Sequence, residues 1–247
     1  MSDFVYLIST YKRSEKQPTL EMLERLGVPK EKIYMSVQTE EDRDRYTEQG
    51  YPSRVGHFVY KKGRNRSDNL NTLIDIVPMG SKMVIMDDDI KNVGKLVGDQ
   101  LKPIDTLEDF CAFLNRGFAL ARKYNTIGFS VYPCYNAFFM NSKDVIRNIG
   151  EGTLLGLVNK GLKFRPDFFV KEDYELTCRV ITRYGAFPRM NYYACNAPHY
   201  SNGGCKEFWE KDGLNVQLAK KLVKMYPSIV QLNPKRVGEV KMKKGAK

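Results

Sequence analysis

The sequence predicts a single-domain α/β protein in which a mixed, mostly parallel central sheet is flanked by helices. Two observations point to this class. The first half of the chain alternates short apolar runs with amphipathic segments, in the order strand, helix, strand, strand, helix, strand. The run at residues 83–86 is apolar throughout, as in strands that are buried on both faces. With 247 residues and no internal repeat, the chain is long enough for one large domain.

The first half contains four expected strands and two expected helices. The strands cover residues 4–9, 32–37, 57–60 and 82–86. The first helix covers residues 19–26, with Thr19 as a possible cap and Gly27 as a stop signal. The second covers residues 67–77, has its apolar side chains on one face and ends before Pro78. Because ligands bind beyond the carboxyl ends of such strands, the end of the 82–86 strand is a candidate site.

The second half has a less regular pattern. A sequence resembling a capping box at residues 106–109 opens a helix that reaches about Lys123. Two further strands are expected at residues 126–132 and 136–141, and helices at residues 142–148, 172–184 and 214–225. The chain after Pro234 is expected to be loosely ordered. We therefore predict a domain of residues 1–234 and a basic tail of residues 235–247.

The net charge of +11 suggests a polyanionic partner, with nucleic acid as the first candidate. The tail of residues 235–247 holds six basic residues and one acidic residue, a net charge of +5. The alternative is a solvated tail that only aids solubility. Charge alone does not choose between DNA, RNA and a membrane surface.

Other features of the composition favour a cytoplasmic protein without a membrane partner. No apolar run approaches the roughly 18 residues of a membrane span. The first residues show neither the basic region nor the apolar core of a secretion signal. The five cysteines form no CxxC pair, so free thiols in a reducing compartment are expected.

Three consecutive aspartates, Asp87, Asp88 and Asp89, follow the apolar run at residues 83–86. Because unpaired buried charge is very costly, these carboxylates must emerge at the end of the strand. Alternation along a strand would make Asp87 and Asp89 project together and Asp88 away. Two hard oxygen ligands suit Mg²⁺ or Mn²⁺, with phosphate oxygens completing the shell. The alternative is an acidic turn or a helix cap.

The first expected strand ends in residues that can hold a nucleotide: Ser9, Thr10, Tyr11 and Arg13. Tyr11 can stack on a base and Arg13 can reach a phosphate. An ordinary loop between a strand and a helix is the alternative.

A second basic segment precedes the helix at residues 67–77. It contains Arg64 and Arg66, and Asn69 follows in the first turn. The positive end of the helix dipole would assist anion binding here. The alternative is a basic surface loop in which Ser67 caps the helix.

Acidic and imidazole groups in the second half complete the candidate site. Glu172 and Asp173 open an expected helix and are candidates for a general base, although the helix dipole alone also favours them there. His199 is a candidate further ligand for a cation held by the aspartates. It could also be a packed histidine or part of a zinc fragment. The aromatic segment at residues 128–139 is either an acceptor pocket or core.

Taken together, these motifs resemble a glycosyltransferase of the GT-A fold over about residues 4–205. The matching segments are Ser9-Thr10-Tyr11-x-Arg13, Gly63-Arg64 with Asn69, Ile85 to Ile90 around the aspartates, and Glu172-Asp173. The resemblance implies that Asp87-x-Asp89 binds a divalent cation on the diphosphate of a nucleotide sugar, with a UDP-sugar as the first choice. It also implies that Asp88 contacts this donor or takes the place of Asp87 or Asp89 in the motif. His199 would complete the metal shell, and Glu172 or Asp173 would lie near the acceptor.

More narrowly, the chain is similar to the phage glycosyltransferases associated with TET-type DNA hydroxylases. The segments at residues 6–11 and 17–20 and the aspartate block carry this similarity. It implies a bacteriophage protein that acts in the host cytoplasm and adds a sugar to hydroxymethylated pyrimidines in double-stranded DNA. A basic protein agrees with such an acceptor, because DNA phosphates require Lys and Arg contacts.

We interpret the sequence as a Mg²⁺- or Mn²⁺-dependent nucleotide-sugar glycosyltransferase with modified DNA as the preferred acceptor. Three alternatives remain open at this point. The acceptor can be a glycan, lipid or protein; the enzyme can be a nucleotidyltransferase, which also uses aspartates and metals; or the chain can be a basic nucleic-acid-binding module without activity.

Overall fold

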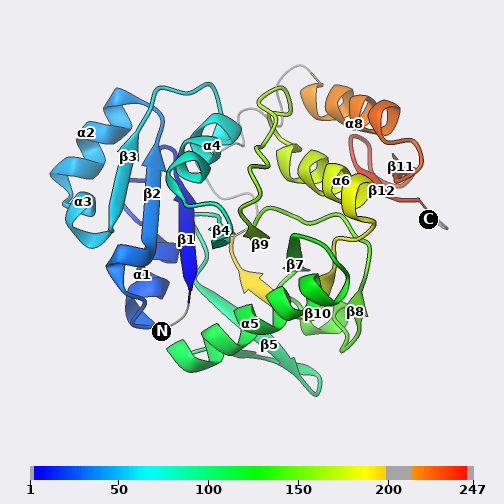
Figure 1. Cartoon of the computed structure of the whole chain (residues 1–247), viewed down its shortest axis with the longest axis horizontal. Coiled ribbons are helices and arrows are strands. Elements are labelled where there is room, and N and C mark those ends of the chain that lie inside the picture. The colour runs from blue at the N-terminus through cyan, green and yellow to red at the C-terminus, as the bar shows by residue number, and fades with distance from the viewer. Residues whose placement is uncertain (1–2, 199–212, 244–247) are drawn as a thin grey trace.

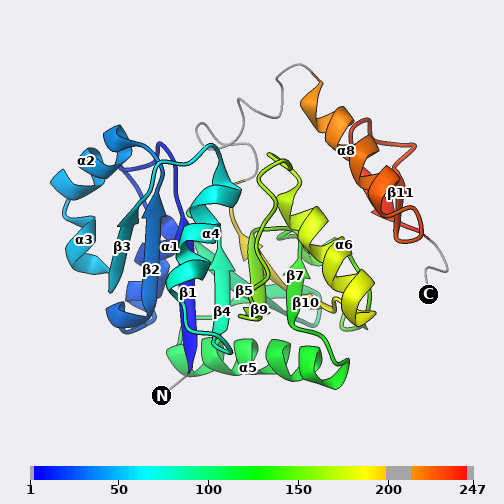
Figure 2. The same cartoon turned by 45° about the horizontal axis from the view of Figure 1, so that its top comes forward.

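The structure is a computed structural model that describes residues 3–198 and 213–243. Within these residues, ten strands form one central sheet and two more form a separate hairpin. Helices cover both faces of the sheet, as Figures 1 and 2 show from two directions. None of the helices in this part of the chain combines the length and apolar character that crossing a bilayer requires.

The central sheet mixes parallel and antiparallel pairs but has one dominant direction. Its strands are β1 (Phe4–Ser9), β2 (Ile33–Val37), β3 (His57–Tyr60), β4 (Lys82–Met86), β5 (Asn92–Val97), β6 (Gln100–Pro103), β7 (Gly128–Tyr132), β8 (Asp144–Val145), β9 (Leu154–Val158) and β10 (Arg189–Asn196). Their order is β3-β2-β1-β4-β9-β7-β10-β5-β6, with β8 beside β10. Among the described strands, only β5, β8 and β9 run against the other seven. The carboxyl ends of β1, β4 and β7 therefore lie at one edge.

Two apolar cores, one on each face of the sheet, hold the helices in place. The helices are α1 (Pro18–Arg25), α2 (Glu40–Glu48), α3 (Tyr51–Arg54), α4 (Arg66–Ile76), α5 (Leu107–Lys123), α6 (Glu172–Tyr184) and α8 (Leu214–Met225). Side chains of α1, α2, α3 and α5 belong to one core, and those of α4, α6 and α8 to the other. Successive residues of β1 alternate between the two cores. Because both faces of this strand are covered, its first five residues are all apolar.

The structure confirms the expected strands and helices of the first half and three of the helices expected in the second. Two elements were predicted wrongly. Residues 136–141 are not a strand but contain a 3-10 helix at Ala137–Phe139, and residues 142–148 contain β8 instead of a helix. In the first of these segments, the side chain of Asn136 accepts a hydrogen bond from the backbone N–H of Phe138 and so caps a turn.

The end of the described chain is more ordered than the sequence suggests. β11 (Val230–Leu232) and β12 (Val240–Met242) pair as an antiparallel hairpin, so the expectation of a loosely ordered chain after Pro234 is wrong at residues 240–242. Between the two strands, Glu239 places a carboxylate oxygen 3.6 Å from Nζ of Lys171. The side chain of Lys171 is completely buried, and burial lowers its pKa. The hairpin thus supplies the negative charge of Glu239 to the buried ammonium group of Lys171, just before α6.

We expect Glu239→Gln to destabilise the protein by about 1–3 kcal/mol, because it removes a negative charge that faces a buried ammonium group. The measurement is the free energy of unfolding in denaturant. Lys241→Gln is the matched control, since Lys241 lies on the same hairpin and is exposed. Equal stability of the two variants would contradict a structural role for the ion pair.

Candidate functional site

The three aspartates lie in a turn directly after β4, which is one of the inner strands of the sheet. The strand ends at Met86, and the chain turns at Asp88 and Asp89. The hydroxyl of Thr19 fixes this turn by donating to the carbonyl of Asp87 at 2.5 Å and accepting from the N–H of Ile90 at 2.9 Å. The expected alternation of the three side chains is not observed, because it applies to an extended strand and not to a turn.

Arg13 joins Asp88 to Asp89. Its Nη1 atom lies 2.6 Å from Oδ1 of Asp88 and 2.7 Å from Oδ2 of Asp89. The guanidinium group comes from the loop after β1, which is the strand next to β4. The two neighbouring carboxylates therefore share one guanidinium group. The sequence predicted that Asp87 and Asp89 would project together, but the structure pairs Asp88 with Asp89.

Arg66, in the first turn of α4, makes the second link. Its Nη2 atom donates to Oδ1 of Asp87 at 2.5 Å, and its Nη1 atom donates to Oε1 of Glu172 at 2.8 Å. Glu172 begins α6, far away in the sequence. Arg66 therefore connects the aspartate turn to the acidic residues that the sequence predicted as candidates for the general base.

Asp173 lies beside this pair and is held by backbone groups. Its Oδ2 atom accepts a hydrogen bond from the N–H of Gly152 at 2.6 Å, and its Oδ1 atom accepts one from the N–H of Tyr174 at 2.8 Å. A Cβ atom at Gly152 would lie 3.0 Å from Nη1 of Arg66 and 3.2 Å from Oδ2 of Asp173. A larger residue at position 152 would therefore press on both of these side chains.

The site contains more negative than positive charge. Within the described residues it brings together five carboxylates and two guanidinium groups, which leaves three unbalanced negative charges if every group is ionised. Burial and the neighbouring carboxylates raise the pKa of Asp87 from 3.8 to about 7. Burial is also the main cause of the raised pKa of Asp88, and burial with repulsion from Glu172 raises the pKa of Asp173 well above its ordinary value. The positive charge of the two arginines is therefore too small to balance the carboxylates.

A divalent cation fits this chemistry, although the described residues do not form a closed cage for one. Among them, no three acidic, histidine or cysteine side chains converge on one point that could hold a metal ion. Arg13 and Arg66 lie between the carboxylates instead. Mg²⁺ is usually held by one or two carboxylates together with substrate phosphates, and such a site needs no cage made by protein alone. His199, the other predicted ligand, lies outside the described residues.

The remaining predicted donor-site residues divide into buried and exposed groups. Ser9, Thr10 and Asn69 are buried, and the amide of Asn69 donates to the hydroxyl of Ser9 at 3.0 Å and to the carbonyl of Ser36 at 3.1 Å. Asn69 therefore ties α4 to the ends of β1 and β2. Tyr11 is half-buried, with Nζ of Lys12 4.9 Å from the centre of its ring.

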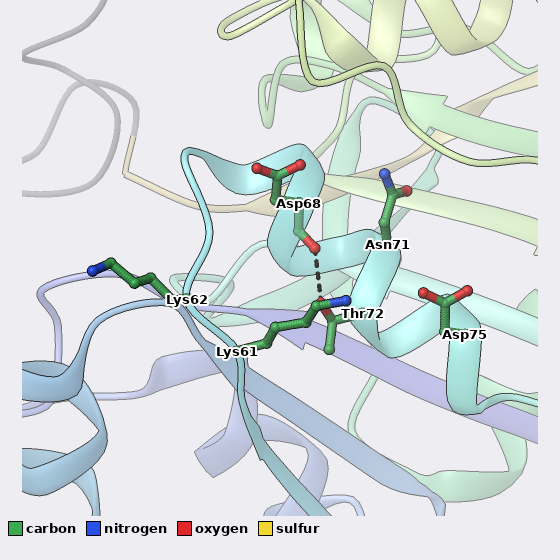
Figure 3. A pocket seen from close by; sticks show the side chains of 6 residues that line it. All are labelled: Lys61, Lys62, Asp68, Asn71, Thr72 and Asp75. Atoms are coloured by element: carbon green, nitrogen blue, oxygen red, sulfur yellow. Dashed lines mark hydrogen bonds between the residues drawn. The ribbon is translucent and has the colours of Figure 1, made fainter.

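Arg64 does not join the aspartates. Its side chain is exposed at the surface, and its Nε atom lies 3.0 Å from Oδ2 of Asp68, which belongs to the first turn of α4. Asp68 also helps to line a shallow cavity of about 250 Å³ outside α4, together with Lys61, Lys62, Asn71, Thr72 and Asp75 (Figure 3). Of the predicted basic segment, the structure therefore brings only Arg66 to the aspartates.

The aromatic segment at residues 128–139 also divides into two parts. Phe129 is fully buried in a core, whereas the side chains of Phe138 and Phe139 are 86% and 56% exposed. The core interpretation is therefore confirmed for Phe129 and wrong for Phe138 and Phe139, and the acceptor pocket stays a prediction.

Sequence reasoning missed several residues beside the aspartates. Gln17 and Tyr46 are buried next to Thr10, and Asp42 accepts hydrogen bonds from the N–H of Lys12 at 3.3 Å on both carboxylate oxygens. Lys12 has a left-handed backbone with φ of 53°. No spacing motif marks these residues, because they meet only after the loop between β1 and α1 packs on α2.

Comparison with known proteins supports the fold. No protein-family model and no curated protein matches the sequence. The structure is similar to the mannosyltransferase PcManGT from Pyrobaculum calidifontis, solved with GDP-Man and Mn²⁺, with a TM-score of 0.55, 15% identity, and coverage of 90% of this chain and 64% of that chain. It is also similar to TarS 1–349 from S. aureus, with a TM-score of 0.52, 12% identity, and coverage of 89% and 65%.

These comparisons show that the chain has the α/β fold of these proteins, and the predicted GT-A-like architecture is confirmed. At such low identity, the likeness shows the fold alone. The chain spans 64% and 65% of the lengths of the two solved chains.

The raised pKa of Asp87 predicts the pH dependence of stability in metal-free protein. Between pH 4 and pH 7, Asp87 binds a proton in the folded state but not in the unfolded state, because its pKa rises from 3.8 to about 7 on folding. The contribution of Asp87 to stability is therefore present at low pH and is lost as the pH rises through this range. We expect Asp87→Asn to make this decline shallower, since an asparagine oxygen can still accept from Arg66 without carrying charge.

The measurement is denaturant unfolding in a chelator at several pH values between 4.5 and 8. Asp99→Asn, at an exposed turn between β5 and β6, is the control and should retain the slope of the parent protein. Identical slopes for the parent and Asp87→Asn would show that Asp87 does not titrate in this range.

Proposed function

We propose that the protein is a glycosyltransferase that uses a nucleotide-sugar donor and a divalent cation, Mn²⁺ or Mg²⁺. The observation that carries this proposal is the surplus of buried and partly buried carboxylates at the end of β4 and the start of α6, which a dication would neutralise. The shared fold with a mannosyltransferase solved with GDP-Man and Mn²⁺ supports it. The proposed donor is a UDP-sugar.

Each group at the site has a role in this proposal. The bound cation would act as a Lewis acid toward the departing diphosphate. Asp89 and Asp87 would hold it, with His199 as a further proposed ligand. Arg13 and Arg66 would contact the diphosphate, because guanidinium groups bind phosphate through paired hydrogen bonds. Both arginines already lie against the carboxylates that would face the cation.

Asp173 is the better candidate for the group that accepts a proton from the acceptor hydroxyl. Its raised pKa makes it a stronger base than an ordinary aspartate, and two backbone N–H groups fix its orientation. Glu172 is already bound to Arg66 at 2.8 Å, which suits it to holding that arginine. This assignment applies to a reaction that inverts the configuration of the sugar.

For the acceptor, we propose hydroxymethylated pyrimidines in double-stranded DNA, modified by a phage protein in the host cytoplasm. The net charge of +11 supports a polyanionic acceptor. The basic residues of the segment 235–247 supply part of this charge, and two of its members, Lys241 and Lys243, are exposed on the C-terminal hairpin. A glycan, lipid or protein acceptor is the alternative outcome of the test below.

We expect Asp89→Asn to lower the rate of sugar transfer by on the order of 100-fold or more while the protein stays folded, because asparagine supplies no negative charge to a cation. An asparagine oxygen can still accept the hydrogen bond from Arg13, so the melting temperature should change little. Rates and melting curves are compared with those of Asp99→Asn. Full activity of Asp89→Asn without added metal would refute the proposed site.

The acceptor is tested by incubating the protein with Mn²⁺, a panel of nucleotide sugars and hydroxymethylated duplex DNA, followed by mass spectrometry of the digested nucleosides. We expect the mass of one nucleoside to increase by one sugar, and unmodified DNA of the same sequence to remain unchanged. DNA binding should weaken steeply with salt. Transfer to oligosaccharides with no change in the DNA would overturn the DNA acceptor but keep the enzyme class. Incorporation from labelled nucleoside triphosphates alone would indicate a nucleotidyltransferase.

A further inference from the structure

We propose that Tyr46, on α2, is a positioning residue for the donor site: through Thr10 it fixes the carboxylate of Asp88, and through Asp88 the guanidinium group of Arg13. This inference deepens the proposed function and rests on it, because the role of Arg13 at the diphosphate belongs to that proposal. It assigns Asp88 the task of orienting an arginine, which separates it from its neighbours Asp87 and Asp89.

The contacts form a buried chain of hydroxyl groups that ends at Asp88. The hydroxyl oxygen of Tyr46 lies 2.6 Å from Oγ1 of Thr10, and Oγ1 of Thr10 lies 2.6 Å from Oδ2 of Asp88. Tyr46 is completely buried and Thr10 is 1% exposed. Water therefore does not compete for these hydrogen bonds, and each group must find its partner within the protein.

The direction of these hydrogen bonds follows from the number of protons available. Asp88 pairs with Arg13 as a carboxylate, which can only accept, so it accepts from both Arg13 and Thr10. Thr10 has one hydroxyl proton, and the bond to Asp88 uses it. The contact between Tyr46 and Thr10 must therefore be a bond that the tyrosine donates.

Gln17 fixes the other end of the chain. Its Nε2 atom lies 2.8 Å from the carbonyl oxygen of Arg13, which can only accept, and this determines which way the amide faces. The same nitrogen lies 2.8 Å from the hydroxyl of Tyr46 and 3.0 Å from Oγ1 of Thr10. The hydroxyl of Tyr46 thus accepts from Gln17 and donates onward. The hydroxyl protons of Tyr46 and Thr10 therefore both point toward Asp88.

The consequence for the donor site is geometric. Asp88 uses Oδ2 for Thr10 and Oδ1 for Arg13, at 2.6 Å in each case. A carboxylate held on both oxygens can act as a rigid support for a guanidinium group. Gln17 also holds the backbone of Arg13, so α2 and the loop after β1 fix this arginine at both its main chain and its side chain.

The test is Tyr46→Phe, which keeps the ring and removes the hydroxyl that starts the chain. We expect the dissociation constant for nucleoside diphosphate in the presence of Mn²⁺, measured by calorimetry with UDP and GDP, to rise roughly fivefold, as for the loss of one buried hydrogen bond. The KM for the donor should rise similarly while kcat changes less than about twofold, because a less firmly held Arg13 binds the diphosphate more weakly in ground and transition states alike.

Tyr51→Phe is the matched control. Tyr51 is buried, its ring centre lies 5.0 Å from that of Tyr46, and its hydroxyl donates to the carbonyl of Ser14 at 2.8 Å. It therefore loses a buried hydrogen bond of the same kind without touching Thr10 or Asp88. We expect both variants to melt at similar temperatures and only Tyr46→Phe to weaken diphosphate binding.

A double-mutant cycle with Thr10→Val separates positioning from general packing. If Tyr46 acts through Thr10, then Tyr46→Phe should have no further effect on diphosphate binding when Thr10 is already valine. Additive effects would overturn the inference, as would equal binding by the parent protein and Tyr46→Phe. If the parent protein binds neither diphosphate, the proposed function fails and this inference fails with it. If the parent binds and Tyr46→Phe binds equally well, only the role of Tyr46 is refuted.

Discussion

Electrostatic imbalance at the end of β4 is the constraint on which the rest of the site depends. Five carboxylates from the aspartate turn and the start of α6 meet only two guanidinium groups in the described residues. Burial makes this arrangement costly, and the raised pKa values of Asp87, Asp88 and Asp173 reflect that cost. A fold that retains such a cluster gives up stability, which is typical of a site that binds a charged ligand.

The fold builds this site from both halves of the sheet. β1 and β4 are parallel neighbours, so the loop carrying Arg13 and the aspartate turn emerge at the same edge. β9 then separates β4 from β7, and Arg66 bridges the aspartate turn to α6. The arginines compensate part of the negative charge without a ligand. In the proposed reaction Arg66 would exchange its hydrogen bond to Asp87, and Arg13 its hydrogen bond to Asp89, for bonds to the diphosphate. A cation would replace them at Asp87 and Asp89, while Asp88 keeps its hydrogen bond to Arg13.

The sequence predicted those parts of the fold and site that depend on local patterns. Apolar runs located β1 to β4, and the charge triplet after β4 located the centre of the site. The sequence did not predict α2, because this helix is almost entirely polar and buries only Asp42 and Tyr46. The partners of the aspartates could not be predicted either. Arg64 and Arg66 look equivalent in the sequence, yet only Arg66 reaches Asp87. No local sequence pattern predicts which of the two arginines does so.

The most direct test of the central claim is the position of manganese in crystals grown with Mn²⁺ and a nucleoside diphosphate, located by its anomalous scattering. We expect a peak within about 2.5 Å of an oxygen of Asp89 or Asp87, with a guanidinium group of Arg13 or Arg66 now against the phosphates. A peak distant from these aspartates, or aspartates that still hold both arginines while the diphosphate is bound elsewhere, would contradict it.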